Sequence, residues 1–132
     1  MATVPLIDHA NASPAVRAVY DDIKQVRGVA DVNNFWKSLA NAPAQLEQVW
    51  SEVKSVMQPG ELDALTKELA YIAVSAANSC TYCVHSHTAA ARAKGMTPAQ
   101  HAELLAVIAL ANRTNALANS LQVPVDPQFQ AG

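Results

Sequence analysis

The stretch from Glu68 to Gly95, "ELAYIAVSAANSCTYCVHSHTAAARAKG", decides the fold expected for this chain of 132 residues. It holds both cysteines, two of the four histidines and a glutamate within an apolar run. Apolar side chains recur at helical spacing before Asn78, and either Asn78 or Ser79 can cap a second helix. A glycine after Lys94 then suits the end of that helix. The stretch therefore predicts two consecutive helices with the cysteines at the start of the second.

The same helical spacing extends to both sides of this stretch. Proline-led or capped starts and apolar periodicity predict further helices near 14–28, 35–40, 43–58 and 97–121, with the first helix of the pair starting near 61. Thr97 and Gln100 form a capping box around Pro98, a strong helix start. No segment alternates apolar and polar residues as a strand does. The prediction is an all-α fold, with residues 1–132 forming a single domain of about six or seven helices.

The composition limits the classes of partner. Charged residues make up 15% of the chain and the formal net charge is −2, so no basic surface for nucleic acid is expected. Low charge combined with abundant alanine favours a homo-oligomer over a helical monomer. No apolar run approaches the roughly 20 residues of a membrane span. The N-terminus also lacks the pattern of a secretory signal, so we expect a cytoplasmic protein with no membrane partner.

Three side chains of the quoted stretch share one face of the second helix. At about 100° per residue, Cys80, Cys83 and His87 lie on one stripe, with Cys80 in the first turn and Cys83 about one turn in. His85 lies about 200° from Cys83 and faces elsewhere. The start of a helix stabilises a thiolate and lowers the pKa of a thiol there. The spacing therefore supplies a mechanism for thiol reactivity.

Glu68 lies within the apolar stripe of the preceding helix, three residues after Leu65 and four before Ile72. One reading places it at the edge of that stripe, where it bends out to water or pairs with Lys67 or another chain. The other reading buries it near the histidine and the thiols. Burial would then raise the pKa of the carboxyl and suit it to accept a proton.

Three interpretations of the cysteine pair remain open on the residues alone. In the cytoplasm, a Cys-x-x-Cys pair is typically catalytic, redox-active or metal-binding. Cys80, Cys83 and His87 could hold zinc with Glu68 as a fourth ligand, although structural zinc sites usually add a second pair of ligands, which the sequence lacks. The third interpretation is two inert buried thiols. We favour a reactive dithiol, with a zinc module next and inert thiols last.

The spacing Glu68-x11-Cys80-x2-Cys83-x3-His87 resembles the signature of the AhpD-like alkylhydroperoxidase branch of the carboxymuconolactone decarboxylase superfamily. The segments "NNFWKSLANAPAQLEQVW" (33–50) and "ANRTNALANSLQVPVD" (111–126) are also similar to that family. The resemblance covers most of residues 30–127, which puts the core of the domain at about 30–122. Some members carry a histidine between the cysteines, where this chain has Tyr82.

The resemblance implies an all-α homo-oligomer, a hexamer in short members or alternatively a trimer, and a thiol peroxidase acting on small hydroperoxides. Cys83 would be the peroxidatic thiolate and Cys80 the resolving thiol. Glu68 and His87 would form the proton relay.

The reductant would be a separate chain, such as a lipoyl-carrying protein or thioredoxin, since no flavin or nicotinamide fingerprint is present. No cofactor and no metal are expected. The decarboxylase branch lacks the cysteine pair, which disfavours that activity. The alternatives are a redox sensor whose disulfide controls assembly, and the zinc module.

Overall fold

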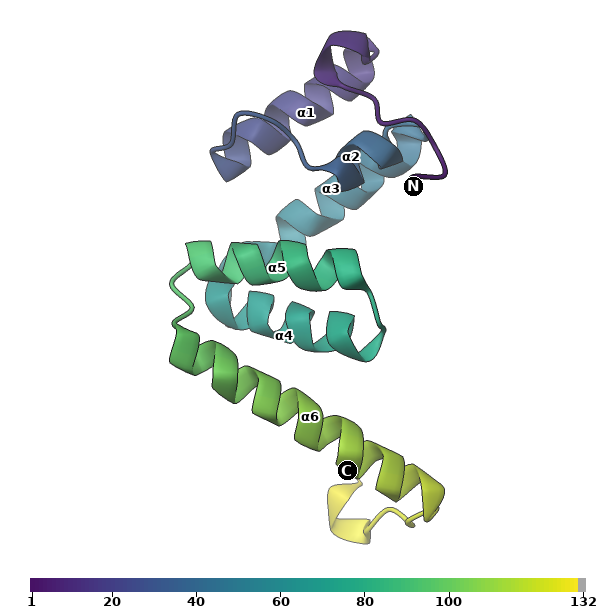
Figure 1. The fold of residues 1–132 in the computed structure, drawn as a ribbon, viewed down its shortest axis with the longest axis vertical. Coiled ribbons are helices and arrows are strands. Elements are labelled where there is room, and N and C mark those ends of the chain that lie inside the picture. The colour runs from purple at the N-terminus through teal and green to yellow at the C-terminus, as the bar shows by residue number, and fades with distance from the viewer. Residues whose placement is uncertain (131–132) are drawn as a thin grey trace. The chain divides into compact units, whose positions relative to one another are not determined.

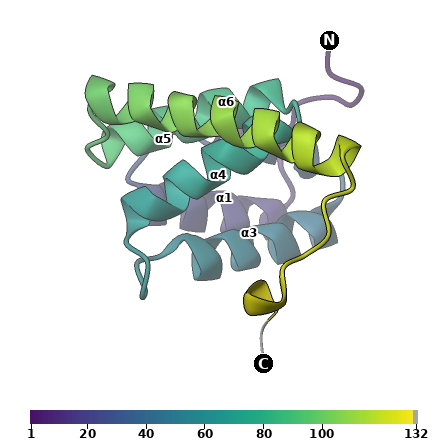
Figure 2. The same cartoon turned by 90° about the horizontal axis from the view of Figure 1, so that it is seen from below.

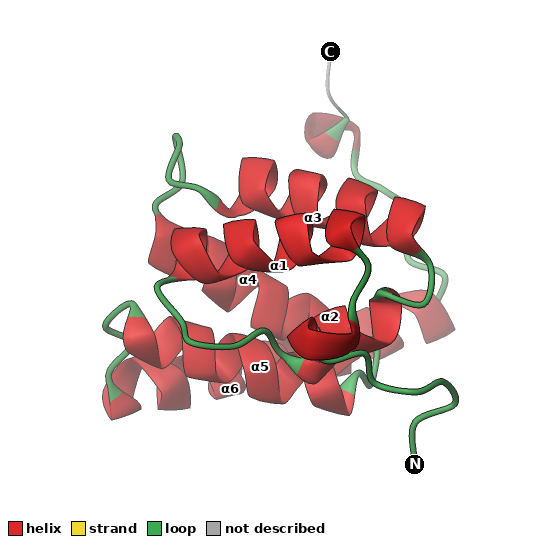
Figure 3. Cartoon of the chain, turned by 90° about the horizontal axis from the view of Figure 1, so that it is seen from above, coloured by secondary structure: helices red, strands yellow, loops and turns green. Residues whose placement is uncertain are grey.

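The computed structural model describes residues 1–130, and every regular element in that range is helical (Figures 1 and 3). The prediction of an all-α fold with about six or seven helices is confirmed, since the described residues form six α-helices. The chain divides into two compact units, residues 1–58 and the part that begins at Pro59. That the two units form a single domain stays a prediction.

The first unit contains α1 (Pro14–Arg27), α2 (Asn34–Leu39) and α3 (Pro43–Met57), preceded by the short 3-10 helix η1 (His9–Asn11). The hydroxyl of Ser13 accepts a hydrogen bond from the Val16 amide and caps α1, which begins at the predicted residue 14. Trp36 and Trp50 meet edge to face, with ring centroids 5.5 Å apart. The core of this unit is made of residues from all three helices and their connections, chiefly Val16, Tyr20, Ile23, Val32, Trp36, Leu46 and Trp50.

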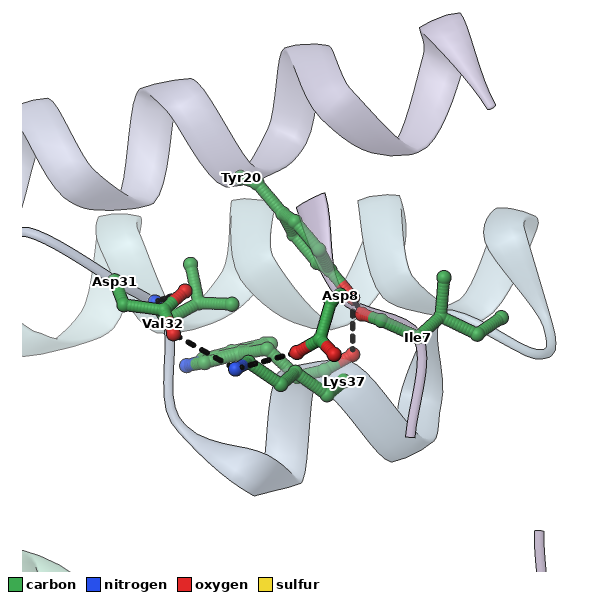
Figure 4. Close-up of polar contacts among 7 residues, drawn as sticks. Ile7, Asp8, Tyr20, Asp31, Val32 and Lys37 are labelled. Carbon is green, nitrogen blue, oxygen red and sulfur yellow. Dashed lines mark hydrogen bonds and ion pairs between the residues drawn. The ribbon is translucent and has the colours of Figure 1, made fainter. Parts of the chain in front are cut away.

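Polar contacts hold the N-terminal segment of this unit against α1 and α2 (Figure 4). The Lys37 ammonium bridges two carboxylates, with Nζ–O distances of 2.7 Å to Asp31 and 2.9 Å to Asp8. The buried Tyr20 hydroxyl donates a hydrogen bond of 2.8 Å to the Ile7 carbonyl. The segment before α1 is therefore held by specific contacts.

The second unit contains α4 (Ala64–Ala77), α5 (Thr81–Ala93), α6 (Pro98–Ser120) and the short 3-10 helix η2 (Pro127–Phe129). α4 and α5 pack closely as an antiparallel pair, and α6 packs against α4 (Figure 2). Asp63 caps α4 through a 2.8 Å hydrogen bond from the Thr66 amide, so the helix begins about three residues later than predicted. The core consists of Ile72, Ala91 and Met96, with Leu65, Leu69, Leu104 and Ile108 half-buried around them.

α5 ends in a Schellman motif, which fixes the backbone that follows it. Gly95 has a φ of 98°, and the Met96 amide donates a 3.0 Å hydrogen bond to the Ala91 carbonyl. A left-handed residue is needed at this position, and glycine adopts that conformation without steric cost. The predicted role of Gly95 is confirmed, and Lys94 lies at the helix C-cap.

α6 begins with the predicted capping box, in which the Thr97 and Gln100 side chains each accept a hydrogen bond from the other's amide. None of its residues is buried in the described chain. Large apolar side chains are exposed along it and just beyond its end, at Leu105, Val107, Leu110, Leu117 and Leu121. Within residues 1–130, no helix combines the length and apolar character needed to cross a membrane.

Candidate active site

The connection between α4 and α5 is short, and Cys80 takes part both in the end of α4 and in the start of α5. Ser79 is left-handed, with a φ of 57°, and the Cys80 amide donates a 3.0 Å hydrogen bond to the Ser75 carbonyl at the end of α4. Cys80 is also the N-cap of α5, since its Sγ accepts from the Cys83 amide at 3.3 Å. The prediction that Asn78 or Ser79 caps the helix was wrong, because both residues are used in ending α4.

Cys80 and Cys83 are joined by a disulfide, with their Cα atoms 5.3 Å apart. Both residues are half-buried. Cys80 precedes the helix and Cys83 is its third residue, because the helix begins one or two residues later than predicted. The first turn of a helix has free amide groups and a partial positive charge, which favour a thiolate when the pair is reduced. The two cysteines are therefore placed for reversible dithiol chemistry.

Glu68 is buried, with 3% of its surface exposed, and pairs with a histidine of the neighbouring helix. Its Oε2 lies 2.7 Å from Nδ1 of His87. An ionised carboxylate can only accept, so Nδ1 carries the proton and Nε2 is the remaining ring nitrogen. His87 follows Cys83 by four residues on α5, which puts the two on one face of that helix. The buried reading of Glu68 is confirmed.

The second carboxylate oxygen of Glu68 has its own partner. Nζ of Lys94 donates a short hydrogen bond to Oε1, so the two oxygens bind two different side chains. Burial alone would raise the pKa of Glu68, but the hydrogen bonds from His87 and Lys94 outweigh it and lower that pKa below its usual value. The expectation of a raised pKa was wrong because it counted burial without these donors.

His87 is covered on one side by an aromatic ring. The rings of Tyr71 and His87 are stacked, with centroids 3.6 Å apart and planes inclined by 19°. Tyr71 belongs to α4, three residues after Glu68, and 40% of its surface is exposed. The tyrosine ring therefore lies against the histidine and partly in solvent, outside the core of the unit.

His85 lies apart from the Glu68–His87 pair, as its helical phase predicts. It is exposed and helps to line a shallow hollow of about 240 Å³ next to one of the cysteines. The residues that line the hollow are Ser79, Cys80, Thr81, Val84 and His85. The hollow therefore borders the Cys80 end of the disulfide.

Lys94 was missed in the sequence as a neighbour of the site, whereas the spacing of Tyr71 from Glu68 allowed a place near it. Lys94 follows His87 by seven residues, which is two turns along the same face of the helix. Tyr71 follows Glu68 by three residues and so shares its face. Among residues 1–130, no group of three or more His, Cys, Asp and Glu side chains is arranged to hold a metal ion. The zinc interpretation therefore gains no support.

Comparison with known proteins identifies the family. The family model described as the carboxymuconolactone decarboxylase family matches residues 42–126. The chain is also similar to a crystal structure of an alkylhydroperoxidase AhpD core from Rhodospirillum rubrum, with 59% identity and a TM-score of 0.97 over 100% of this chain and 99% of that one. No curated protein matches the chain. The chain belongs to the carboxymuconolactone decarboxylase family and is an AhpD-like member of it.

Proposed function

We propose that this protein is a thiol-dependent hydroperoxide reductase. The observation that carries the proposal is the buried Glu68–His87 pair, 2.7 Å apart, on the face of α5 that also presents Cys83 of a Cys80–Cys83 disulfide. The similarity to an alkylhydroperoxidase AhpD core supports the same reaction. The family name describes a decarboxylase, but decarboxylation makes no use of a dithiol.

In the proposed reaction, His87 takes the thiol proton of Cys83 at Nε2 while Glu68 stabilises the imidazolium. The Cys83 thiolate attacks one peroxide oxygen, the O–O bond breaks, and the departing alkoxide takes the proton to leave as an alcohol. Cys83 is thereby oxidised to a sulfenic acid. The Cys80 thiol then attacks that sulfur, which forms the disulfide and releases water.

A dithiol on a separate chain would restore the reduced enzyme, with a lipoyl-carrying protein or thioredoxin as donor. One donor thiolate attacks the disulfide, and its second thiol completes the exchange, leaving the donor oxidised. The hollow beside Cys80 supports access of such a thiol. The proposed location is the cytoplasm, where reducing systems keep such donors reduced.

We also propose that the protein is a homo-oligomer, a hexamer or alternatively a trimer. Exposed apolar side chains along α6 support this proposal, because a helix normally buries such a face against a partner.

The test is hydroperoxide consumption by the purified protein with dihydrolipoamide, thioredoxin and glutathione as donors. We expect turnover with a dithiol and its loss in Cys83→Ser. Ser86→Ala, which removes a hydroxyl from the same helix, is the matched control and should remain active. Wild-type turnover in Cys83→Ser, or no turnover with any donor and peroxide, would contradict the proposal.

A further inference from the structure

We propose that Lys94 is a positioning residue of the dithiol site, which holds Glu68 in the orientation and charge state that His87 requires. The inference rests on the proposed function, since it assigns a role within the proton relay proposed for it. It adds a lysine to a motif that comprises Glu68, Cys80, Cys83 and His87.

The two contacts of the Glu68 carboxylate support this role. Lys94 binds Oε1 of Glu68, while His87 binds Oε2 at 2.7 Å, so both oxygens are occupied from the same neighbouring helix. A carboxylate fastened at both oxygens cannot rotate about its terminal bond without breaking one of the contacts. Lys94 therefore fixes the plane in which Glu68 presents its second oxygen to the imidazole.

The backbone of Lys94 is itself held in place. Its amide donates a 3.1 Å hydrogen bond to the Ala90 carbonyl, and the left-handed Gly95 ends the helix immediately afterwards. The side chain thus starts from a fixed point, two turns after His87 on α5. A long flexible side chain gains most from a contact when its backbone is already ordered.

Electrostatics give Lys94 a second effect on the same carboxylate. The Glu68 side chain is 4% exposed and that of Lys94 is 36% exposed, so one charge is buried and the other reaches water. Burial would raise the Glu68 pKa, and the donors His87 and Lys94 lower it on balance. α6, which also packs against α4, carries His101, Glu103 and Arg113. Within the described chain, none of these three forms a hydrogen bond or ion pair with Glu68.

An alternative is that Lys94 only favours the end of α5, where a cation interacts well with the helix dipole. Arg92 lies in the last turn of the same helix and is exposed, so it should have that effect as well. Removing Arg92 therefore separates a general helix-end charge from the specific contact with Glu68.

The first measurement is the titration of the Glu68 side-chain carboxyl by ¹³C NMR in the reduced, full-length protein, with Glu68→Gln used to assign its signal. In Lys94→Met we expect the Glu68 pKa to rise by about one unit or more, as for a carboxyl that loses an adjacent cation. Lys94→Arg should keep the pKa low, and Arg92→Met should leave it unchanged. The inference is wrong if the Glu68 pKa is the same in Lys94→Met as in Arg92→Met. It is also wrong if both Lys94→Met and Lys94→Gln unfold, because the lysine would then be a structural residue.

The second measurement is the rate of thiol alkylation against pH, which needs neither peroxide nor donor. As the pH falls, the alkylation rates of the wild type and of Lys94→Met should each approach the rate of Glu68→Gln, since that variant mimics the protonated carboxyl. We expect Lys94→Met to converge at a higher pH than the wild type, and convergence at the same pH would overturn the inference. If this shift is found in a protein with no peroxidase activity, the proposed function fails while the role of Lys94 stands.

Discussion

The ring of Tyr71 lies flat against the imidazole of His87, with 3.6 Å between the centroids and 19° between the planes. His87 is thereby fixed by two kinds of contact, the ring face against Tyr71 and Nδ1 against Glu68. Such a pair of constraints leaves Nε2 with one direction in which to exchange a proton. The stacked tyrosine is therefore expected to matter for rate more than for folding.

Replacing Tyr71 by phenylalanine should preserve the stack and most of the peroxidase activity. Tyr71→Ala should lower kcat/KM by about two- to tenfold, because a stacked aromatic pair contributes roughly 0.5–1.5 kcal/mol. Steady-state peroxidase assays measure this effect, and circular dichroism checks the fold. Equal loss in both variants would show that the hydroxyl, and not the stack, is the important group.

Acid should destabilise the protein through Glu68. Its pKa is lower in the folded chain than the usual value of 4.5, which we take for the unfolded chain. The carboxylate therefore adds stability that is complete above about pH 4.5 and is lost as the pH falls through the folded pKa. Urea unfolding of the wild type and Glu68→Gln from pH 7 to pH 3 tests whether this stability is lost on acidification.

The difference in unfolding free energy between those two proteins should shrink on acidification within that window. Other carboxylates with lowered pKa values, such as Asp22 and Asp31, are present in both proteins and cancel in the comparison. A difference that stays constant down to pH 3 would contradict the linkage.

Much of the fold could be predicted because its signals are local. Ser13 before Pro14 and the Thr97 capping box each set a helix start from a few neighbouring residues, and both starts are confirmed. The pairing of Glu68 with His87 could also be predicted, since both lie on apolar helix faces that must meet in the core.

The remaining features depend on tertiary contacts that periodicity does not encode. The lowered pKa of Glu68 needs a donor from the far end of α5, and the sequence gives no measure of how far the Lys94 side chain reaches across to α4. Cys80 as an N-cap was missed because serine and asparagine are the better caps. Here Ser79 is left-handed instead, a conformation that is uncommon outside glycine.

The left-handed conformation of Ser79 leads to a prediction about stability. Ser79→Gly should stabilise the oxidised protein by about 1 kcal/mol, because glycine adopts a positive φ without the steric cost that a Cβ brings. Ser79→Ala is the matched control, since alanine retains the Cβ and should give no gain. The midpoint of urea unfolding, measured for both variants, distinguishes relief of strain from loss of the hydroxyl.

The proposed homo-oligomer leads to a prediction about α6. Val107, Leu110, Leu117 and Leu121 are spaced so that they lie along one face, and each is more than half exposed. A charged residue in the middle of a buried apolar interface is strongly unfavourable. The double variant Leu110→Glu, Leu117→Glu should therefore shift the mass from an oligomer towards the 14.0 kDa of one chain.

Light scattering coupled to size-exclusion chromatography measures that mass. Val26→Glu makes a similar change at an exposed apolar residue of α1 and should leave the assembly intact. A wild-type protein that elutes at 14.0 kDa would refute the oligomer outright. A double variant with the wild-type mass would instead place the subunit contact on another face, because two buried carboxylates are incompatible with an apolar interface.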